Sequence, residues 1–245
     1  MPGGFTWNAG ASERLAAVAA RYGLGPAAQE ALHTLLELLA REPSAITTVR
    51  EPSAAVDVHV ADSLVALEVE EVLRARAIAD LGSGGGFPGL ALAAALPEAR
   101  VALVESAARK SDFLRRAAAQ TGLANVEVVH ARAEAWTGGI GAHDLVTARA
   151  LAPLPVVLEY AAPLLRLGGT VVAWKSRPEP SEEADGVAAA AVLGLTPPVG
   201  RPVEPFELAR HRSLYLSSKV SDTPPNYPRR PGMARKRPLH ASSRG

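Results

Sequence analysis

The stretch from Asp80 to Gly89 reads Asp-Leu-Gly-Ser-Gly-Gly-Gly-Phe-Pro-Gly, and it constrains the fold more than any other part of the chain. An apolar run over residues 77–79 leads into it, and an alanine-rich apolar run over 90–96 follows. This order predicts a strand, a tight turn and a helix. Five of the eight residues from Gly82 to Gly89 are glycine. Glycine adopts positive φ and lets backbone approach a ligand closely, so we predict a ligand-binding turn.

The segment after this turn alternates between short apolar runs and helical patterns, which predicts a parallel sheet covered on both faces. Two further apolar runs, near Val203 and over 214–216, predict a closing hairpin that is partly antiparallel. We therefore expect an α/β fold with a mostly parallel seven-stranded sheet. The expected strands are 77–81, 101–105, 126–130, 144–148 and 170–174, and the expected helices are 89–96, 107–121, 153–165 and 182–193.

Four segments follow from the patterning along the chain. Residues 1–11 are expected to be disordered, and 12–56 to form a small helical cap with helices from Ser12 and over 26–40. Residues 57–218 form the main domain, which begins with a helix over 57–73. Residues 219–245 form a basic, proline-rich tail that holds seven of the 26 Lys and Arg residues and one of the 25 acidic residues. Such a tail either contacts phosphate or is a solvated end.

The composition narrows the chemistry. The chain has 245 residues, of which 48% are hydrophobic and 21% charged, as in a globular protein. It has no cysteine, which excludes disulfides, thiolate metal sites and a cysteine nucleophile. No apolar run is long enough to span a membrane, and the first residues lack a basic segment followed by an apolar one. We expect a cytoplasmic protein.

Two ligands fit the glycine-rich turn. Gly84, Gly86 and Gly89 match the G-x-G-x-x-G dinucleotide pattern. Gly82, Gly84 and Gly86, preceded by Asp80, match the loop typical of S-adenosylmethionine-dependent methyltransferases. Both patterns place an acid, Glu105, at the end of the next strand, where a carboxylate accepts hydrogen bonds from ribose hydroxyls. The turn alone leaves both ligands open.

Three features favour S-adenosylmethionine. Asp80 lies at the end of its strand, where a carboxylate suits an ammonium better than a pyrophosphate. Ala133 and Glu134 follow the third strand, at the place where a methyltransferase contacts adenine. The chain also ends in the hairpin, which leaves little length for a second domain that would hold a hydride acceptor.

The chain as a whole resembles the bacterial 16S rRNA guanine-N7 methyltransferases, the family once named glucose-inhibited division protein B. The resemblance runs from about Leu35 to Leu239. Its landmarks, in chain order, are Thr47-Thr48-Val49-Arg50, His59-Val60-Ala61-Asp62-Ser63, the stretch 80–89, Glu105-Ser106 with Arg109-Lys110, Arg132-Ala133-Glu134, Thr147-Ala148-Arg149-Ala150, Trp174-Lys175, Arg210-His211 and 227–232. The resemblance implies a Rossmann-like class I methyltransferase fold.

The family also implies roles for individual residues. Cofactor binding falls to Asp80, Gly82, Gly84, Gly86, Phe87, Glu105, Ala133, Glu134 and Arg149, with Glu105 on the ribose and Ala133-Glu134 on the adenine edge. The catalytic candidates are Arg149, His59, Asp62 and Lys175. The RNA-binding candidates are Arg132, Lys175, Arg210, Arg229 and Arg230. His59 and Asp62 are three residues apart, so on a helix they share a face and can form a hydrogen bond.

The implied reaction needs no strong base, because guanine N7 carries a lone pair and no proton. It depends instead on alignment of the reacting atoms and on an unstacked base. The expected cofactor is S-adenosylmethionine, and the expected partner is 16S rRNA or the small ribosomal subunit. We expect a monomer without metal or membrane. Two other readings are a nicotinamide-dependent oxidoreductase and a non-catalytic RNA-binding ribosome-assembly protein.

Overall fold

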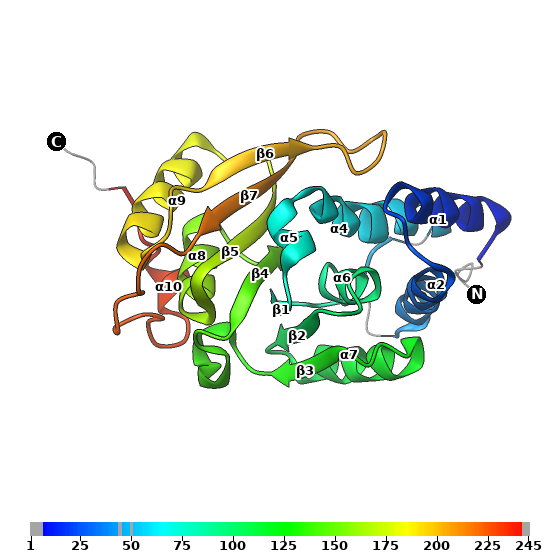
Figure 1. Ribbon diagram of the computed structural model, residues 1–245, viewed down its shortest axis with the longest axis horizontal. Helices are drawn as coiled ribbons and strands as arrows, with labels where there is room; N and C mark the ends of the chain where they lie inside the picture. The colour runs from blue at the N-terminus through cyan, green and yellow to red at the C-terminus, as the bar shows by residue number, and fades with distance from the viewer. Residues whose placement is uncertain (1–6, 44–45, 50, 242–245) are drawn as a thin grey trace.

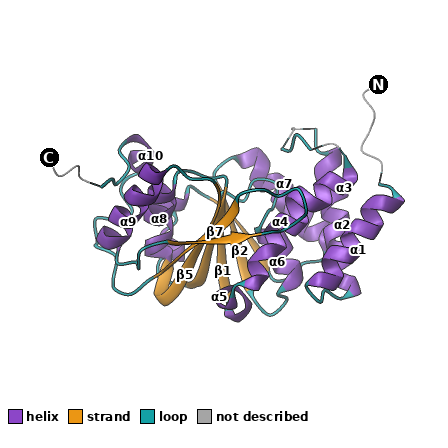
Figure 2. Ribbon diagram, turned by 90° about the horizontal axis from the view of Figure 1, so that it is seen from above, coloured by secondary structure: helices purple, strands orange, loops and turns teal. Residues whose placement is uncertain are grey.

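The computed structural model describes residues 7–43, 46–49 and 51–241. A seven-stranded sheet runs through the middle of the molecule and has helices on both faces (Figures 1 and 2). Its strands are β1 (Ala77–Leu81), β2 (Arg100–Glu105), β3 (Val126–His130), β4 (His143–Arg149), β5 (Leu165–Ser176), β6 (Val199–Val203) and β7 (Arg212–Ser218). The expected mostly parallel seven-stranded sheet is confirmed.

The strand order is β3-β2-β1-β4-β5-β7-β6. Strands β1 to β5 pair in parallel, whereas β7 pairs antiparallel with β5 and with β6. The order reverses between β1 and β4, which lie side by side although β2 and β3 separate them in sequence. In open α/β sheets, ligands bind beyond the carboxyl ends of the strands at such a reversal. The glycine-rich turn follows β1 and therefore lies at this point.

Hydrophobic side chains on the two faces of the sheet belong to two separate clusters. On β1, Ile78 faces the cluster shared with the N-terminal helices, while Ala79 and Leu81 face the other. This follows from the two-residue side-chain period of a strand. The first face is covered by α6 (Gly89–Ala95) and α7 (Ala108–Thr121). Helix α2 (Pro26–Arg41) packs on α6 and α7, and α1 (Ala9–Arg21) packs on α2 and on the segment that begins at residue 52. The second face is covered by α8 (Leu154–Ala161), α9 (Pro180–Leu193) and α10 (Met233–Lys236).

Two expectations about the N-terminal part are wrong. Helix α1 begins at Ala9 rather than at Ser12, because the Asn8 side chain accepts a hydrogen bond from Ala11 N at 2.8 Å and caps the helix. Residues 9–11 are thus helical, and residues 1–6 lie outside the described part. The expected helix over 57–73 is broken into α3 (Pro52–Ala55), the π-helical η1 (Val56–Ala61), α4 (Asp62–Leu64), the 3-10 turn η2 (Val65–Glu68) and α5 (Glu70–Arg74).

The π-helical turn η1 carries His59, and Asp62 follows it directly. A π-helical turn is often found at functional sites, because it rotates the side chains that follow it. His59 and Asp62 therefore do not pair with each other. His59 Nε2 forms a hydrogen bond with Thr47 Oγ1 at 2.9 Å, while Asp62 pairs with Arg149.

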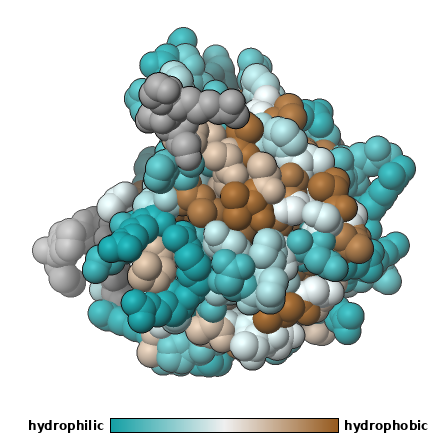
Figure 3. Space-filling model, turned by 90° about the vertical axis from the view of Figure 1, so that its left-hand side faces the viewer, coloured by the Kyte–Doolittle hydropathy of each residue, from teal (hydrophilic) through white to brown (hydrophobic). Residues whose placement is uncertain are grey.

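The C-terminal segment, residues 219–241, packs against the body. Ala234 on α10 is 2% exposed and belongs to the second hydrophobic cluster. The face at this end of the molecule shows hydrophobic surface among hydrophilic side chains (Figure 3). Val187 and Val192 on α9 are exposed.

Candidate functional site

The glycine-rich turn has the backbone that its sequence predicts. Gly82, Gly84 and Gly86 have φ values of 69°, 54° and 92°. A Cβ atom at Gly82 would lie 2.7 Å from Leu151 Cδ1, and one at Gly86 would lie 2.5 Å from Leu90 Cδ1. At Gly84 the nearest atom would be 3.6 Å away. Leucine side chains therefore lie against Gly82 and Gly86, whereas no side chain lies against Gly84 and the space beside it is open.

Glu105 ties this turn to the end of β2. Its Oε2 accepts a hydrogen bond from Gly84 N at 3.1 Å, and its Oε1 accepts one from Ala107 N at 2.8 Å. The side chain is buried. A carboxylate offers about four lone-pair positions, so two backbone donors leave capacity for ligand hydroxyls. This arrangement fits a ribose next to Gly84.

Asp80 lies beneath the turn and is 1% exposed. Its Oδ1 accepts a hydrogen bond from Thr147 Oγ1 at 2.9 Å, and its Oδ2 accepts one from Gly89 N at 3.2 Å, at the start of α6. Burial raises the pKa of this carboxyl to about 6, although the hydrogen bonds oppose the shift. The carboxylate thus stabilises the turn through hydrogen bonds to Thr147 and Gly89. It is buried, so it does not lie on a surface where the ammonium of a ligand could contact it.

A small cavity of about 200 Å³ opens beside the turn, at the carboxyl ends of β1, β2 and β3. Gly82 lines it together with Ser106 after β2, Ala133 and Glu134 after β3, and Leu151 after β4. Ala133 is therefore where the sequence places it. Glu134 is mostly buried, and its Oε1 accepts a hydrogen bond from Gly232 N at 3.1 Å, so this carboxylate also holds the C-terminal segment.

Arg149, at the end of β4, joins the turn to η1 and α4. Its Nη1 donates to Val58 O and to Asp62 Oδ2, both at 2.9 Å. Its guanidinium carbon lies 5.8 Å from the centre of the Phe87 ring. Asp62 Oδ1 faces Arg212 Nε at 3.2 Å, so this buried carboxylate is paired with two arginines.

His59 and Phe87 stack with their ring centres 5.1 Å apart and their planes at 18°. Burial and the nearby Arg149 lower the pKa of His59 to about 4. His59 is therefore neutral at physiological pH and frames the site rather than carrying a charge. Phe87 is 5% exposed, so its ring is packed between His59 and Arg149.

The other candidates divide into paired and exposed side chains. Lys175 Nζ donates to Ala152 O at 2.8 Å and pairs with Glu182 Oε1 at 2.6 Å. Arg229 pairs with the buried Glu159, with Nε to Oε1 at 2.9 Å and Nη2 to Oε2 at 2.5 Å. The sequence predicts that Lys175 and Arg229 bind RNA. In the structure both side chains are instead paired with glutamates of the same chain.

Arg132, Arg210 and Arg230 are exposed, although Arg132 Nη1 also lies 4.0 Å from Glu134 Oε1. Arg210 lines a groove of about 1100 Å³ between α1 and the connection from β6 to β7. The same groove is lined by Arg177, His211 and Arg212, and Arg212 links it to Asp62. Glutamates also line this groove, at positions 179, 183, 204 and 207. Through Arg212 and Asp62 the groove leads to the Arg149 end of the site.

Several residues of the site escaped the sequence analysis. Thr147 supports Asp80, and the Trp174 indole Nε1 donates to Asp62 O at 2.6 Å. Both residues lie in motif blocks that carry the family resemblance, directly before or near Arg149 and Lys175, and this position is the signal that could have identified them. Arg212 had no such signal, because only strand pairing brings β7 next to β5.

Among the described residues, no group of three or more His, Asp or Glu side chains is arranged to hold a metal ion. In the same part of the chain, no helix is long and apolar enough to cross a membrane.

Comparison with known proteins points in one direction. Residues 28–197 match the family model described as rRNA small subunit methyltransferase G. A protein of that name from Rubrobacter xylanophilus is 48% identical over 178 residues, which cover 69% of this chain and 67% of that protein. A second, from Desulfitobacterium hafniense, is 40% identical over 180 residues, covering 71% of this chain and 74% of that protein.

Solved structures share the fold. The S-adenosylmethionine-dependent methyltransferase SibL, in its apo form, superposes with a TM-score of 0.57 at 15% identity, covering 86% of this chain and 74% of that one. A predicted O-methyltransferase from Agrobacterium tumefaciens gives a TM-score of 0.51 at 25% identity, covering 66% of this chain and 81% of that one. The Rossmann-like class I methyltransferase fold is confirmed.

Proposed function

The chain belongs to the rRNA small subunit methyltransferase G family, and from this membership we propose that it methylates N7 of a guanine in 16S rRNA. It is an enzyme, a methyltransferase that uses S-adenosylmethionine. The observation that carries the proposal is the turn at Gly84, which is open on one side and joined to Glu105 on the other. The choice of N7 rests on the family resemblance of the motifs.

The residues at this turn fit the cofactor. A Cβ at Gly84 would enter the open space, which is the property expected where backbone lies against a ligand. Glu105 keeps acceptor capacity for ribose hydroxyls, and the cavity between Ser106 and Ala133 is next to it. S-Adenosylmethionine supplies a methyl group on a positively charged sulfur. We assign its ribose to Glu105 and its adenine to the Ala133 side.

The surrounding side chains suit a reaction that depends on alignment. Guanine N7 has a lone pair and no proton, so no side chain has to remove one. His59 is neutral and stacked on Phe87, which supports a framing role. Arg149 is held by Asp62 and Val58, so its position is fixed before the base arrives. Fixed positioning of this kind contributes several kcal/mol to lowering a barrier.

The RNA is proposed to approach along the groove that Arg210 lines. Exposed guanidinium groups bind phosphates and give affinity that depends on salt. We propose that one chain supplies the whole site and acts on the small subunit or its RNA in the cytoplasm. The family gives no support to the nicotinamide-dependent oxidoreductase or to the non-catalytic assembly protein.

The proposal is tested with purified protein, S-adenosylmethionine labelled in its methyl group, and 16S rRNA either naked or in small subunits. The RNA is digested to nucleosides and compared with an N7-methylguanosine standard. We expect the label in N7-methylguanosine from at least one of the two substrates. Label in another nucleoside would overturn the choice of N7, and label in none would overturn the RNA substrate.

A further inference from the structure

The C-terminal segment forms part of the cavity beside the glycine-rich turn. The cavity is lined by Gly82, Ser106, Ala133 and Leu151 from the sheet end and by Arg235 from α10. Arg235 is 84 residues beyond Leu151 in the sequence. Tyr160 on α8 also lines this cavity, so helices α8 and α10 complete a wall that the strand ends leave open.

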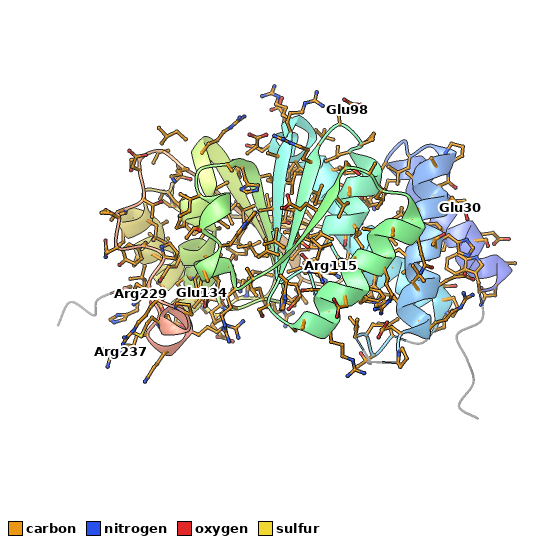
Figure 4. The ribbon with its side chains drawn as sticks, turned by 90° about the horizontal axis from the view of Figure 1, so that it is seen from below. Glu30, Glu98, Arg115, Glu134, Arg229 and Arg237 are labelled. Atoms are coloured by element: carbon orange, nitrogen blue, oxygen red, sulfur yellow. The ribbon has the colours of Figure 1, made fainter. Side chains whose placement is uncertain are left out.

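The segment is fixed in this place by buried contacts. Glu159 on α8 is 1% exposed, and its carboxylate receives both the Arg229 side chain and the Arg229 backbone N–H. Three residues further on, Gly232 N donates to Glu134 Oε1. Figure 4 shows Glu134 and Arg229 close to the C-terminal helix α10. A buried carboxylate is costly without a cation beside it, and Arg229 of the C-terminal segment supplies that cation. The segment is therefore an integral part of the folded structure.

Arg235 connects this segment to the turn. Its Nη2 donates to Leu151 O at 2.8 Å. The Leu151 side chain lies against Gly82, where a Cβ would come within 2.7 Å of it. The guanidinium therefore holds the residue that closes the back of the turn. Arg235 also forms a side-chain hydrogen bond with Tyr160 on α8. A guanidinium has five N–H donors, so these two contacts leave donors for a further partner.

We propose that Arg235 is a cofactor-binding residue that contacts the adenosine end of S-adenosylmethionine. The cavity volume of about 200 Å³ is below the roughly 300 Å³ at which whole small-molecule pockets begin, so it suits the nucleoside end of the cofactor. A purine offers ring-nitrogen acceptors and a flat face, and an arginine both donates hydrogen bonds and stacks on such faces. The inference rests on the proposed function, which supplies the cofactor.

The test measures binding of S-adenosylhomocysteine by calorimetry to the wild type, Arg235→Ala and Lys236→Ala. Lys236 is the adjacent exposed residue on the same helix and does not line the cavity. We expect Arg235→Ala to raise the dissociation constant about tenfold or more, as for a lost hydrogen bond from a charged group. Lys236→Ala should stay within about twofold, since a rim charge that lines no cavity contributes little.

Thermal unfolding of the same three proteins without ligand separates binding from folding, and we expect similar midpoints because Arg235 is exposed. Equal affinity of the wild type and Arg235→Ala would overturn this inference alone. A wild type that binds no S-adenosylhomocysteine would overturn the proposed function and the inference with it.

Discussion

Asp62 and Arg149 are 87 residues apart in the sequence and are joined by a hydrogen bond of 2.9 Å from Nη1 to Oδ2. The pair links the segment before β1 to the end of β4, directly beside Phe87 of the glycine-rich turn. Arg212 on β7 approaches the other oxygen of Asp62. One buried carboxylate thus pairs with an arginine at the end of β4 and with a second arginine on β7.

Removing this carboxylate should affect both stability and activity. Asp62→Ala leaves Arg149 and Arg212 without their common partner, and we expect it to lower the free energy of unfolding by about 3 kcal/mol. Methylation should fall below detection, because Arg149 loses its fixed position. Chemical denaturation and the labelled-methyl assay measure the two effects.

Asp112→Asn is the control for this change, since Asp112 forms an exposed pair with Arg115. It should alter the unfolding free energy by less than about 0.5 kcal/mol. Equal effects of the two substitutions would contradict the role given to Asp62.

Glu105 should contribute to cofactor affinity through its charge and both of its oxygens. Glu105→Gln keeps the size of the side chain but replaces one acceptor by a donor, which then faces either Gly84 N or Ala107 N. We expect S-adenosylhomocysteine to bind about tenfold or more weakly, measured by calorimetry. Glu98→Gln, at an exposed position, should bind as the wild type does. Unchanged affinity in Glu105→Gln would remove the ribose role.

Arg229 and Arg230 are neighbours with different predicted roles. Arg229→Ala leaves Glu159 buried without its cation and should lower the free energy of unfolding by about 3 kcal/mol. Arg230→Ala should leave stability nearly unchanged, because Arg230 is exposed, and should weaken RNA binding with a smaller salt dependence. Denaturation curves and RNA binding at several salt concentrations separate them. Equal stability and equal RNA binding of the two variants would contradict the roles given to Arg229 and Arg230.

His59 gives the site a defined pH dependence. Its pKa is about 4 in the folded chain, lowered mainly by burial, and near 6.5 when unfolded. Its stabilising contribution is complete above the unfolded pKa and is lost as pH falls from about 6.5 toward 4. Between about pH 7 and pH 5, wild type should therefore lose up to about 2 kcal/mol relative to His59→Asn in chemical denaturation. A constant difference between the two proteins would refute the lowered pKa.

The part of the fold that follows β1 could be predicted because each element has its own local pattern. The alternation of apolar runs and helical patterns predicts β1 and β3 with the bounds that the structure has. The positive φ values at Gly84 and Gly86 follow from residue type, because glycine adopts them readily. The segment before β1 was mispredicted as one helix. Its sequence is helical throughout, and the breaks come from packing that places His59 and Asp62 in separate partnerships.

The motifs place Glu105 and Arg149 at the carboxyl ends of two strands, and the structure has them there, while their contacts with a ligand stay predictions. The sequence does not predict which partner a charged side chain has when that partner is distant in the chain. Lys175 and Arg229 carry the positive charge expected of RNA-binding residues. In the structure, however, Glu182 pairs with Lys175 and Glu159 pairs with Arg229. The two glutamates lie on α8 and α9, and tertiary packing brings these helices next to Arg229 and Lys175. A local sequence pattern contains no information on such packing. For the same reason the position of Arg235 in the cavity wall could not be predicted from the sequence.

The most direct test compares two glycines that share a positive φ, Gly84 in the turn and Gly122 after α7, with values of 54° and 67°. A Cβ at either position meets no atom closer than 3.6 Å, so the backbone strain of a substitution is similar at both. Cells that lack the protein receive the wild type, Gly84→Asp or Gly122→Asp, and N7-methylguanine is then mapped in their 16S rRNA. We predict one N7-methylguanine that depends on the wild type or Gly122→Asp and is absent with Gly84→Asp. The same modification in cells without the protein, or with Gly84→Asp, would contradict the assignment.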